Sequence, residues 1–424
     1  MRNLLSETHI QSEEEINETN ALEKKCMEGC SDSRQALKEK VLATLDKYNI
    51  TVPEMSSEEV ANYICCYTWG LGPVEHIYND PTVDEVQIIG PETVYSIRKG
   101  VYTKEEVSFA SEDDLFHLIK RLIRTNKGDL NERNPIIRTV RPGDGSRVTI
   151  TGPPTTKTYT LTIRKHDTFL ISRDALIANG TMDGFTYDRL ALFSLGRLNT
   201  LISGPVNAGK TTLIREMFGH GRSELRAVSI EPDSELRLLK HYPGWNIIEL
   251  EEQKKIGIDM DVLFELALQL SPVRIIFGEI LGITELRGAI RAGVRGQTGN
   301  FSTYHSKNIM QALFNMALTY AEESHSSVMT TEMALRWVVQ AFDIIIQIHT
   351  DPQRGIKKVV HVAEPYIDGQ GNLKLHDVVK WHGSKDDYYQ GHWEYFDLHE
   401  SIIEKLHQNG TPVEAIERVA VVCS

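Results

Sequence analysis

The feature that most constrains the fold is the segment Gly204-Pro205-Val206-Asn207-Ala208-Gly209-Lys210-Thr211, which fits the phosphate-loop pattern. It follows the apolar run NTLIS and precedes the run TTLIREMF, which are typical of a strand and a helix. In this order the backbone N–H groups of a glycine-rich turn can surround a phosphate at a helix N-terminus. The alternative is a chance match in an ordinary strand-turn-helix, and the flanking runs argue against it. The segment therefore predicts a nucleotide-binding α/β domain.

The residue types in this loop predict the contacts with the nucleotide. We expect Lys210 to reach the β- and γ-phosphates, and the Thr211 hydroxyl to bind Mg²⁺. ATP and Mg²⁺ are the expected cofactors. The predicted nucleotide-binding residues of the loop are Gly204, Pro205, Asn207, Ala208, Gly209, Lys210, Thr211 and Thr212.

A second signal is the apolar run Arg274-Ile275-Ile276-Phe277-Gly278-Glu279, which ends in a carboxylate. At the carboxyl edge of a parallel sheet this carboxylate would face the phosphate loop and polarise the attacking water. We predict Glu279 as the catalytic base. A purely structural glutamate is the alternative.

Two further patterns follow predicted strands. The run Ser229-Ile230-Glu231-Pro232-Asp233-Ser234-Glu235 gathers carboxylates, and Glu231 or Glu235 is suited to orienting water or to reaching Mg²⁺ through a water molecule. A solvated acidic turn that caps a helix is the alternative. The run NFSTYH would carry His305 towards the γ-phosphate, although a packed or exposed histidine explains it equally well.

The order of apolar runs predicts the organisation of the chain. From residue 188 strands alternate with helices, which predicts parallel strands with helical crossovers, whereas residues 71–165 carry short β-rich runs around one amphipathic helix. The predicted fold is α/β, with a RecA-like P-loop domain preceded by a smaller α+β domain and a helical segment. The predicted segments are a tail (1–35), a helical segment (36–70), the α+β domain (71–165), a linker (166–187), the ATPase domain (188–365) and a C-terminal extension of unknown role (366–424).

Composition narrows the class of protein. A net charge of −13 argues against a nucleic-acid binder, because proteins that grip phosphates usually present a basic surface. The first residues lack the basic start and apolar core of an export signal, so we expect a cytoplasmic protein. The five cysteines, Cys26, Cys30, Cys65, Cys66 and Cys423, have no repeated spacing and are predicted to be reduced thiols. A metal bound by Cys26 and Cys30 on one helical face is the alternative.

The phosphate loop, the acidic run, the strand ending in Gly278-Glu279 and the run from Gly296 to His305 together resemble the type II/type IV secretion ATPase superfamily, and most closely its CpaF-like branch of Tad/Flp pili. In that family these pieces are Walker A, the Asp box, an atypical Walker B and the His box. The resemblance runs from about Leu71 to Pro365. It implies that Arg147 and Arg164 match arginines that reach the nucleotide phosphates from the amino-terminal domain.

The chain departs from the family pattern near Walker B. The family usually reads Leu-Arg-x-x-Pro-Asp-Arg before this strand, whereas this chain has Gln269 and Val273 in place of the first arginine and the aspartate. Leu281 stands in place of the arginine that the family has after Gly-Glu. Gln297 stands in place of the first histidine of the family's His box. Arg291 and Arg295 lie close by in the sequence as substitutes.

The resemblance implies a hexameric ring beneath an inner-membrane platform protein, peripheral at the inner face of the cell membrane. The expected function is an ATP-hydrolysing motor in which domain closure drives pilin polymerisation or substrate translocation. No zinc is expected, because the paired Cys-x-x-Cys repeat of one family branch is missing. The alternatives are a conjugation-type motor that moves DNA, and a nucleotide-gated assembly protein with little turnover.

Overall fold

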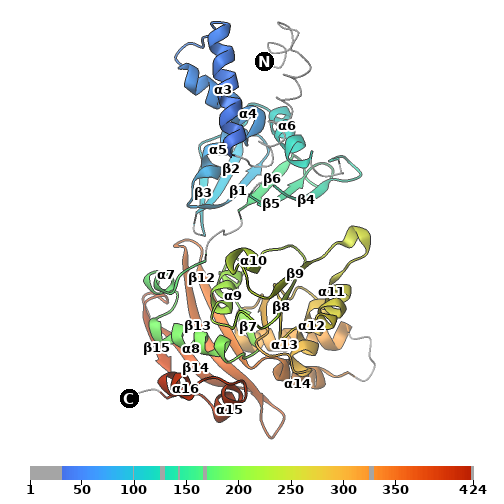
Figure 1. Cartoon of the computed structure of the whole chain (residues 1–424), viewed down its shortest axis with the longest axis vertical. Coiled ribbons are helices and arrows are strands. Elements are labelled where there is room, and N and C mark those ends of the chain that lie inside the picture. The colour runs from blue at the N-terminus through green and yellow to red at the C-terminus, as the bar shows by residue number, and fades with distance from the viewer. Residues whose placement is uncertain are drawn as a thin grey trace. The chain divides into compact units, whose positions relative to one another are not determined.

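A computed structural model of the chain describes residues 31–98, 100–124, 129–141, 144–165, 170–323 and 329–421. The chain divides into two compact units, with the division between Asp167 and Thr168. Each unit has its own sheet and its own buried core (Figure 1). Cys26, Cys30 and Cys423 lie outside the described residues, whereas Cys65 is buried and Cys66 is partly buried.

The first unit begins with helices α3 (Ser31–Lys47) and α4 (Ser57–Trp69), which pack around Leu45, Val60 and Ala61. The start of α4 follows from its sequence. The Ser56 side chain accepts a hydrogen bond from the Glu59 N–H, and the Glu59 carboxylate accepts one from the Ser56 N–H, which forms a capping box. Helix α4 therefore begins at Ser57, with Ser56 as its N-cap. Helix α3 begins within the predicted tail.

A six-stranded antiparallel sheet follows, in the order β3-β2-β1-β6-β5-β4. Its alternating buried residues pack against the apolar face of helix α6. Two of the strands, β3 and β4, were missed in the sequence: the three middle residues of β3 are all exposed, and the exposed positions of β4 include the apolar Ile136 and Val140. The elements are η1 (Gly72–Val74), α5 (Glu75–Asn79), β1 (Val83–Ile89), β2 (Thr93–Arg98), β3 (Val101–Glu105), α6 (Glu112–Ile123), β4 (Ile136–Val140), β5 (Arg147–Thr151) and β6 (Thr160–Arg164).

The second unit is built on a nine-stranded sheet in the order β15-β14-β13-β12-β7-β11-β10-β8-β9. The strands from β12 to β9 run parallel, as the alternation of strands and helices predicted, and β13, β14 and β15 add an antiparallel half. The strands are β7 (Thr200–Ser203), β8 (Ala227–Glu231), β9 (Ile247–Glu251), β10 (Arg274–Phe277), β11 (Phe301–Tyr304), β12 (Ile344–Asp351), β13 (Ile356–Ile367), β14 (Leu373–Gly383) and β15 (Gly391–Tyr395).

Helices cover both faces of this sheet, because successive strand residues enter different cores. In β10, Ile276 enters one core, whereas Ile275 and Phe277 enter the other. The first core includes residues of α8, α9, α15 and α16, and the second includes residues of α11 to α14. The helices are α7 (Arg173–Ala178), α8 (Gly184–Leu195), α9 (Lys210–Phe218), α10 (Leu238–His241), η2 (Lys254–Ile256), α11 (Met260–Gln269), α12 (Ile283–Val294), α13 (Ile309–Glu323), α14 (Thr331–Ala341), α15 (Glu400–Gln408) and α16 (Val413–Ala420).

Two predicted boundaries differ from the structure. Helix α7 and the start of α8 occupy much of the predicted linker and belong to the second unit. The predicted C-terminal extension is part of the second unit, because β14 and β15 continue its sheet and α15 and α16 lie beside it (Figure 1). Residues 166–169 lie outside the described part of the chain.

A buried arginine fastens this C-terminal part to the rest of the unit. Arg189 of α8 is fully buried and donates to the carbonyl oxygens of Val419 at 3.0 Å, Val378 at 2.8 Å and Phe396 at 2.7 Å. Burial lowers its pKa to about 10. Because the acceptors are backbone carbonyls, no sequence pattern predicts these hydrogen bonds.

Candidate active site

The phosphate loop connects β7 to α9. Gly209, at its last turn, has a left-handed φ of 84°, which a glycine adopts without strain. A β-carbon at Gly204 would lie 2.6 Å from the Ile348 carbonyl oxygen, so β12 excludes any larger residue there. The Gly204 N–H donates to the Tyr304 carbonyl at 3.2 Å, which fixes the start of the loop against β11. Both glycines of the motif are therefore required by geometry.

The structure brings three of the predicted site residues together. The Lys210 ammonium lies 3.1 Å from the Gly204 carbonyl oxygen, 2.9 Å from that of Pro205 and 3.0 Å from His305 Nδ1. On its other side, His305 Nε2 contacts the Glu279 carboxylate. These contacts form a continuous polar chain from the loop lysine to the carboxylate that ends the β10 run. The side chains of His305 and Glu279 are 37% and 32% exposed, so solvent reaches them.

The topology explains why these residues meet. Strands β7, β11, β10 and β8 are consecutive neighbours and parallel, so their carboxyl ends share one edge of the sheet. The phosphate loop, His305 and Glu279 each follow one of the first three strands, and Glu231 ends the fourth. The Ile280 N–H donates to the Thr303 carbonyl at 2.9 Å, and the Thr303 hydroxyl donates to the Gly278 carbonyl at 2.7 Å, which hold the segment bearing Glu279 against β11.

Glu231 has different surroundings from Glu279. It is 3% exposed, and its Oε1 accepts hydrogen bonds from the backbone N–H groups of Glu235 at 3.2 Å and Leu236 at 3.1 Å. Burial raises the pKa of Glu231 to about 8. A β-carbon at Gly278 would lie 2.6 Å from Glu231 Oε1, so the glycine before Glu279 makes room for this carboxyl group. The contacts give Glu231 a part in shaping the acidic turn.

Glu235 lies on the same acidic turn. Helix α9, which follows the phosphate loop, contacts this turn through one arginine. Arg215 of α9 donates to the Glu235 carbonyl at 2.7 Å and to the Leu236 carbonyl at 3.1 Å. Arg215 is itself 3% exposed. The turn and the phosphate loop are therefore connected through one helix, an arrangement that the sequence analysis did not foresee.

The residues present fit a magnesium nucleotide. The loop begins at Gly204, turns at Gly209 and leads directly into α9, so backbone N–H groups gather at a helix N-terminus. Thr211 stands in the first turn of that helix, where a hydroxyl can reach a phosphate-bound cation. Lys210 belongs to the same loop and is 6% exposed.

Arg147 and Arg164 lie in the first unit, directly opposite each other on β5 and β6. Opposite residues of neighbouring strands point to the same face of a sheet, so the two guanidinium groups share one face. The turn before Arg147 is ordered by Asp144, whose carboxylate accepts from the Ser146 N–H at 2.9 Å and pairs with Arg141 at 2.7 Å.

Two of the four residues that depart from the family pattern are exposed, and Val273 and Gln297 are partly buried. Leu281 is 63% exposed, and Gln269 is exposed at the end of α11. Of the two arginines considered as substitutes, Arg291 lies 3.5 Å from the Glu265 carboxylate and Arg295 is the exposed C-cap of α12.

One residue beside the loop was missed in the sequence. Lys357 of β13 approaches the phosphate loop: a β-carbon at Gly209 would lie 3.5 Å from Lys357 Cδ and 3.8 Å from its Nζ. Nothing near Lys357 in the sequence indicates this contact, because its segment PQRGIKK reads as a turn and a polar strand start.

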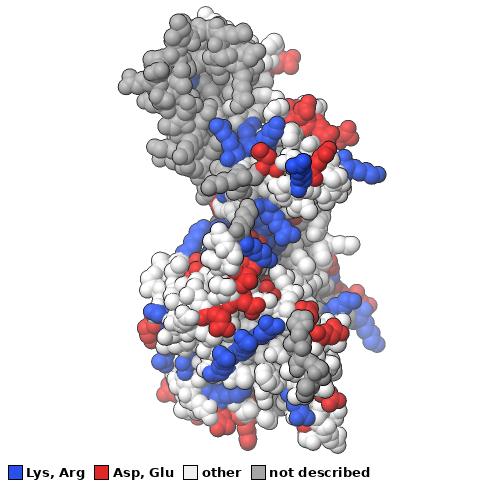
Figure 2. Space-filling view, turned by 90° about the vertical axis from the view of Figure 1, so that its right-hand side faces the viewer, with Lys and Arg blue, Asp and Glu red and all other residues white. Residues whose placement is uncertain are grey.

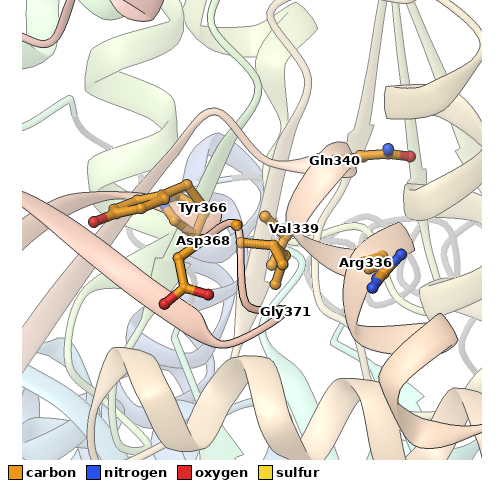
Figure 3. A pocket seen from close by; sticks show the side chains of 9 residues that line it. Arg336, Val339, Gln340, Tyr366, Asp368 and Gly371 are labelled. Carbon is orange, nitrogen blue, oxygen red and sulfur yellow. The ribbon is translucent and has the colours of Figure 1, made fainter.

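A separate hollow of about 530 Å³ lies between α14 and the end of β13. Figure 3 shows Arg336, Val339 and Gln340 on the helix side and Tyr366 and Asp368 on the strand side. Because β13 runs antiparallel to β12, the end of β13 lies at the opposite edge of the sheet from the phosphate loop. The hollow is therefore not part of the site.

The described part of the chain contains no cluster of three or more metal-ligating side chains, and none of its helices has the length and apolar character of a membrane span. Acidic and basic side chains are interspersed over the face that Figure 2 shows, and its described residues form no broad basic surface there.

The fold and the site define a P-loop protein of the α/β class. Comparison with known families places residues 68–399 in the family described as "Type II/IV secretion system protein". The chain belongs to this family, which covers more than half of its length. It therefore has a RecA-like ATPase domain preceded by a smaller amino-terminal domain.

Individual relatives agree with this assignment. The chain is 24% identical to Protein VirB11 of Rhizobium radiobacter over 329 residues, which cover 70% of this chain and 92% of the relative. It is 22% identical to the type IV secretion system protein VirB11 of Brucella suis, with 70% and 89% covered. Among solved structures, the ATPase DotB of Yersinia pseudotuberculosis matches with a TM-score of 0.50 at 14% identity, and the match covers 82% of each chain. This last likeness supports the fold alone.

Proposed function

We propose that this chain is an ATP-hydrolysing motor of a secretion or pilus-assembly machine. The observation that carries the proposal is the polar chain from Lys210 through His305 to Glu279 at the carboxyl edge of the sheet. Membership of the family described as type II/IV secretion system proteins, with relatives such as the type IV secretion system protein VirB11, supports a role in secretion. The proposed ligand is ATP with Mg²⁺.

The residues of the site have separate roles in nucleotide binding and hydrolysis. Backbone N–H groups of the loop and Lys210 bind the phosphates, and Thr211 holds the metal. Glu279 accepts a proton from the attacking water, and His305 orients the carboxylate through the contact at its Nε2. Bound Mg²⁺ would supply neutralisation of the charge that develops on the phosphate oxygens. Glu231 and Glu235 shape the turn beside these groups, and a water-mediated contact of Glu231 with the metal would require Glu231 to be ionised.

The direct test of nucleotide binding is Lys210→Ala. We expect the affinity for ATP to fall about hundredfold or more, equal to about 2.7 kcal/mol, because a charge-assisted contact with the phosphates is lost. Titration with a fluorescent ATP analogue measures it. Unchanged affinity and turnover in the variant would remove the central claim.

Arg147 and Arg164 are proposed to act as a clamp on the γ-phosphate, because two arginines on one face of a sheet can pair with phosphate oxygens. ATP should then draw the two units together more than ADP does, and hydrolysis should release them. Spin-label distances in Arg147→Ala and Arg164→Ala, with ATP and with ADP, test this idea. If both variants close and turn over as the wild type does, the clamp is wrong.

The finer assignment is a CpaF-like motor in a hexameric ring, cytoplasmic and bound beneath an inner-membrane platform protein. Prepilin and platform genes beside the gene for this chain would support it, whereas a relaxase gene would favour a conjugation motor that moves DNA. The acidic net charge of −13 weighs against the DNA motor. The replacement of the family arginine by the exposed Leu281 favours a second candidate, an assembly protein gated by ATP binding. Binding of ATP without turnover by the wild-type ring would identify that candidate.

A further inference from the structure

Two lysines lie beside the phosphate loop, and they differ in what their ammonium groups contact. Lys210, inside the loop, has one contact for each of its three N–H donors: the carbonyl oxygens of Gly204 and Pro205, and His305 Nδ1. Lys357, on β13, makes no hydrogen bond or ion pair with any residue that the structure describes. An ammonium without an acceptor is available to a ligand.

The side chain of Lys357 lies beside the phosphate loop. A β-carbon at Gly209 would be 3.5 Å from Lys357 Cδ and 3.8 Å from Lys357 Nζ, so the side chain extends along the turn that precedes α9. That turn presents its backbone N–H groups at a helix N-terminus, where an anion is favoured. A second cation on its flank increases the local positive potential.

The strand that carries Lys357 is held in register by its neighbours. The next residue, Lys358, is 5% exposed; its Nζ lies 3.8 Å from the centre of the Trp381 ring and 4.6 Å from that of Trp393. It also donates to the Gly180 carbonyl at 3.0 Å. Cation–π contacts with two indole rings are favourable and directional. The Trp393 indole N–H donates to the Val359 carbonyl at 2.8 Å. The start of β13 is therefore held at Lys358 and at the residue after it.

From these observations we infer that Lys357 is a second phosphate-binding cation of the site, which contacts the polyphosphate of the nucleotide from the antiparallel half of the sheet. The inference rests on the proposed binding of ATP. Lys357 acts by charge on the phosphates, and Lys358 acts as a positioning residue that keeps the strand in place.

The experiment compares nucleotide affinities of the full-length protein and its variants. In Lys357→Gln the affinity for ATP should fall about tenfold, because one charged contact with the phosphates is lost. ADP should show a smaller loss and AMP none, since the effect follows the number of phosphates. Lys357→Arg keeps the charge and should restore most of the affinity. Lys374→Gln is the matched control: Lys374 is an exposed lysine of β14, opposite Tyr366 near the far end of the β13 hairpin, and its variant should bind as the wild type does.

The outcomes separate this inference from the proposed function. If Lys357→Gln binds ATP as tightly as the wild type while Lys210→Ala does not bind it, Lys357 has no phosphate contact and the nucleotide site stands. An equal loss of affinity for ATP and AMP, or a lower melting temperature of the nucleotide-free variant, would show a structural role and overturn the inference. A wild-type protein that binds no ATP would overturn both.

Discussion

The two halves of the nine-stranded sheet use charged side chains in opposite ways. In the parallel half, His305 and Glu279 stand at strand ends and are about one-third exposed. On the antiparallel half, Arg189 of α8 and Lys358 of β13 are almost completely buried; Arg189 donates to three backbone carbonyls, and Lys358 donates to one and packs against two indole rings. A buried cation whose donors meet carbonyls holds the chain together, whereas a partly exposed group at a strand end can meet a ligand. The partly exposed charges at the strand ends of the parallel half are thus expected to serve chemistry, and the buried charges packed on the antiparallel half to serve stability.

The largest expected effect lies in the parallel half. Glu279→Gln keeps the size and hydrogen bonding of the side chain but removes the base, so turnover should fall about a thousandfold. ATP affinity and the melting temperature should change little, because Glu279 is at the surface of the site. Steady-state phosphate release and calorimetry measure the two quantities. A variant that hydrolyses ATP near the wild-type rate would place the base elsewhere, with Glu231 or Glu235 next to be tested.

The counterpart in the antiparallel half is Arg189→Met. The methionine fills similar space but leaves the carbonyl oxygens of Val419, Val378 and Phe396 without their donor. We expect the free energy of unfolding to fall by about 3 kcal/mol. Arg418→Met, an exposed position on α16, is the control and should cost little. Urea unfolding measures both. Equal stability of the two variants would contradict the division between the halves.

A smaller effect is expected in the parallel half where Gly278, the residue before Glu279, lies against the Glu231 carboxyl group. Gly278→Ala would place a β-carbon 2.6 Å from Glu231 Oε1, and the hydrogen bonds to the acidic turn prevent this side chain from moving freely. We expect a loss of about 2 kcal/mol of stability. Gly369→Ala, with nothing within 4 Å of its β-carbon, is the control. In a Glu231→Ala background the cost of Gly278→Ala should shrink, and a cost that stays the same would show that Glu231 is not the obstacle.

A further test of the parallel half is a pH dependence at Glu231. Its pKa is raised from 4.5 to about 8 by burial, so between these values the unfolded chain loses a proton that the folded chain keeps. Stability therefore falls as pH rises through this window, with a slope of at most about 1.4 kcal/mol per pH unit. Glu231→Gln removes the titration, so its stability relative to wild type should rise from about pH 5 to about pH 8. Urea midpoints at several pH values test this, and parallel curves would contradict it.

Local patterns in the sequence were sufficient for much of the second unit. The phosphate loop can be recognised in the sequence because its glycines, lysine and threonine have a fixed short spacing. Its flanking strand and helix are apolar runs. The parallel order of the strands followed from the alternation of such runs with helices. The residues of the loop itself lie within about ten positions of chain, whereas the alternation extends over the whole parallel half.

The tertiary structure alone decided which distant residues meet. Lys210 and His305 are separated by 95 positions, and Arg189 and Val419 by 230. The C-terminal residues looked like a separate extension because their strands join the sheet edge through backbone hydrogen bonds, which any sequence of suitable polarity can form. Glu231 and Glu279 read alike in the sequence, as a carboxylate after an apolar strand, and only packing made one buried and the other partly exposed. The sequence by itself therefore determined the phosphate loop and the parallel strands, since short-range patterns encode them. The surroundings of each charge, including the approach of Lys357 to Gly209, depend on how distant strands are placed next to one another.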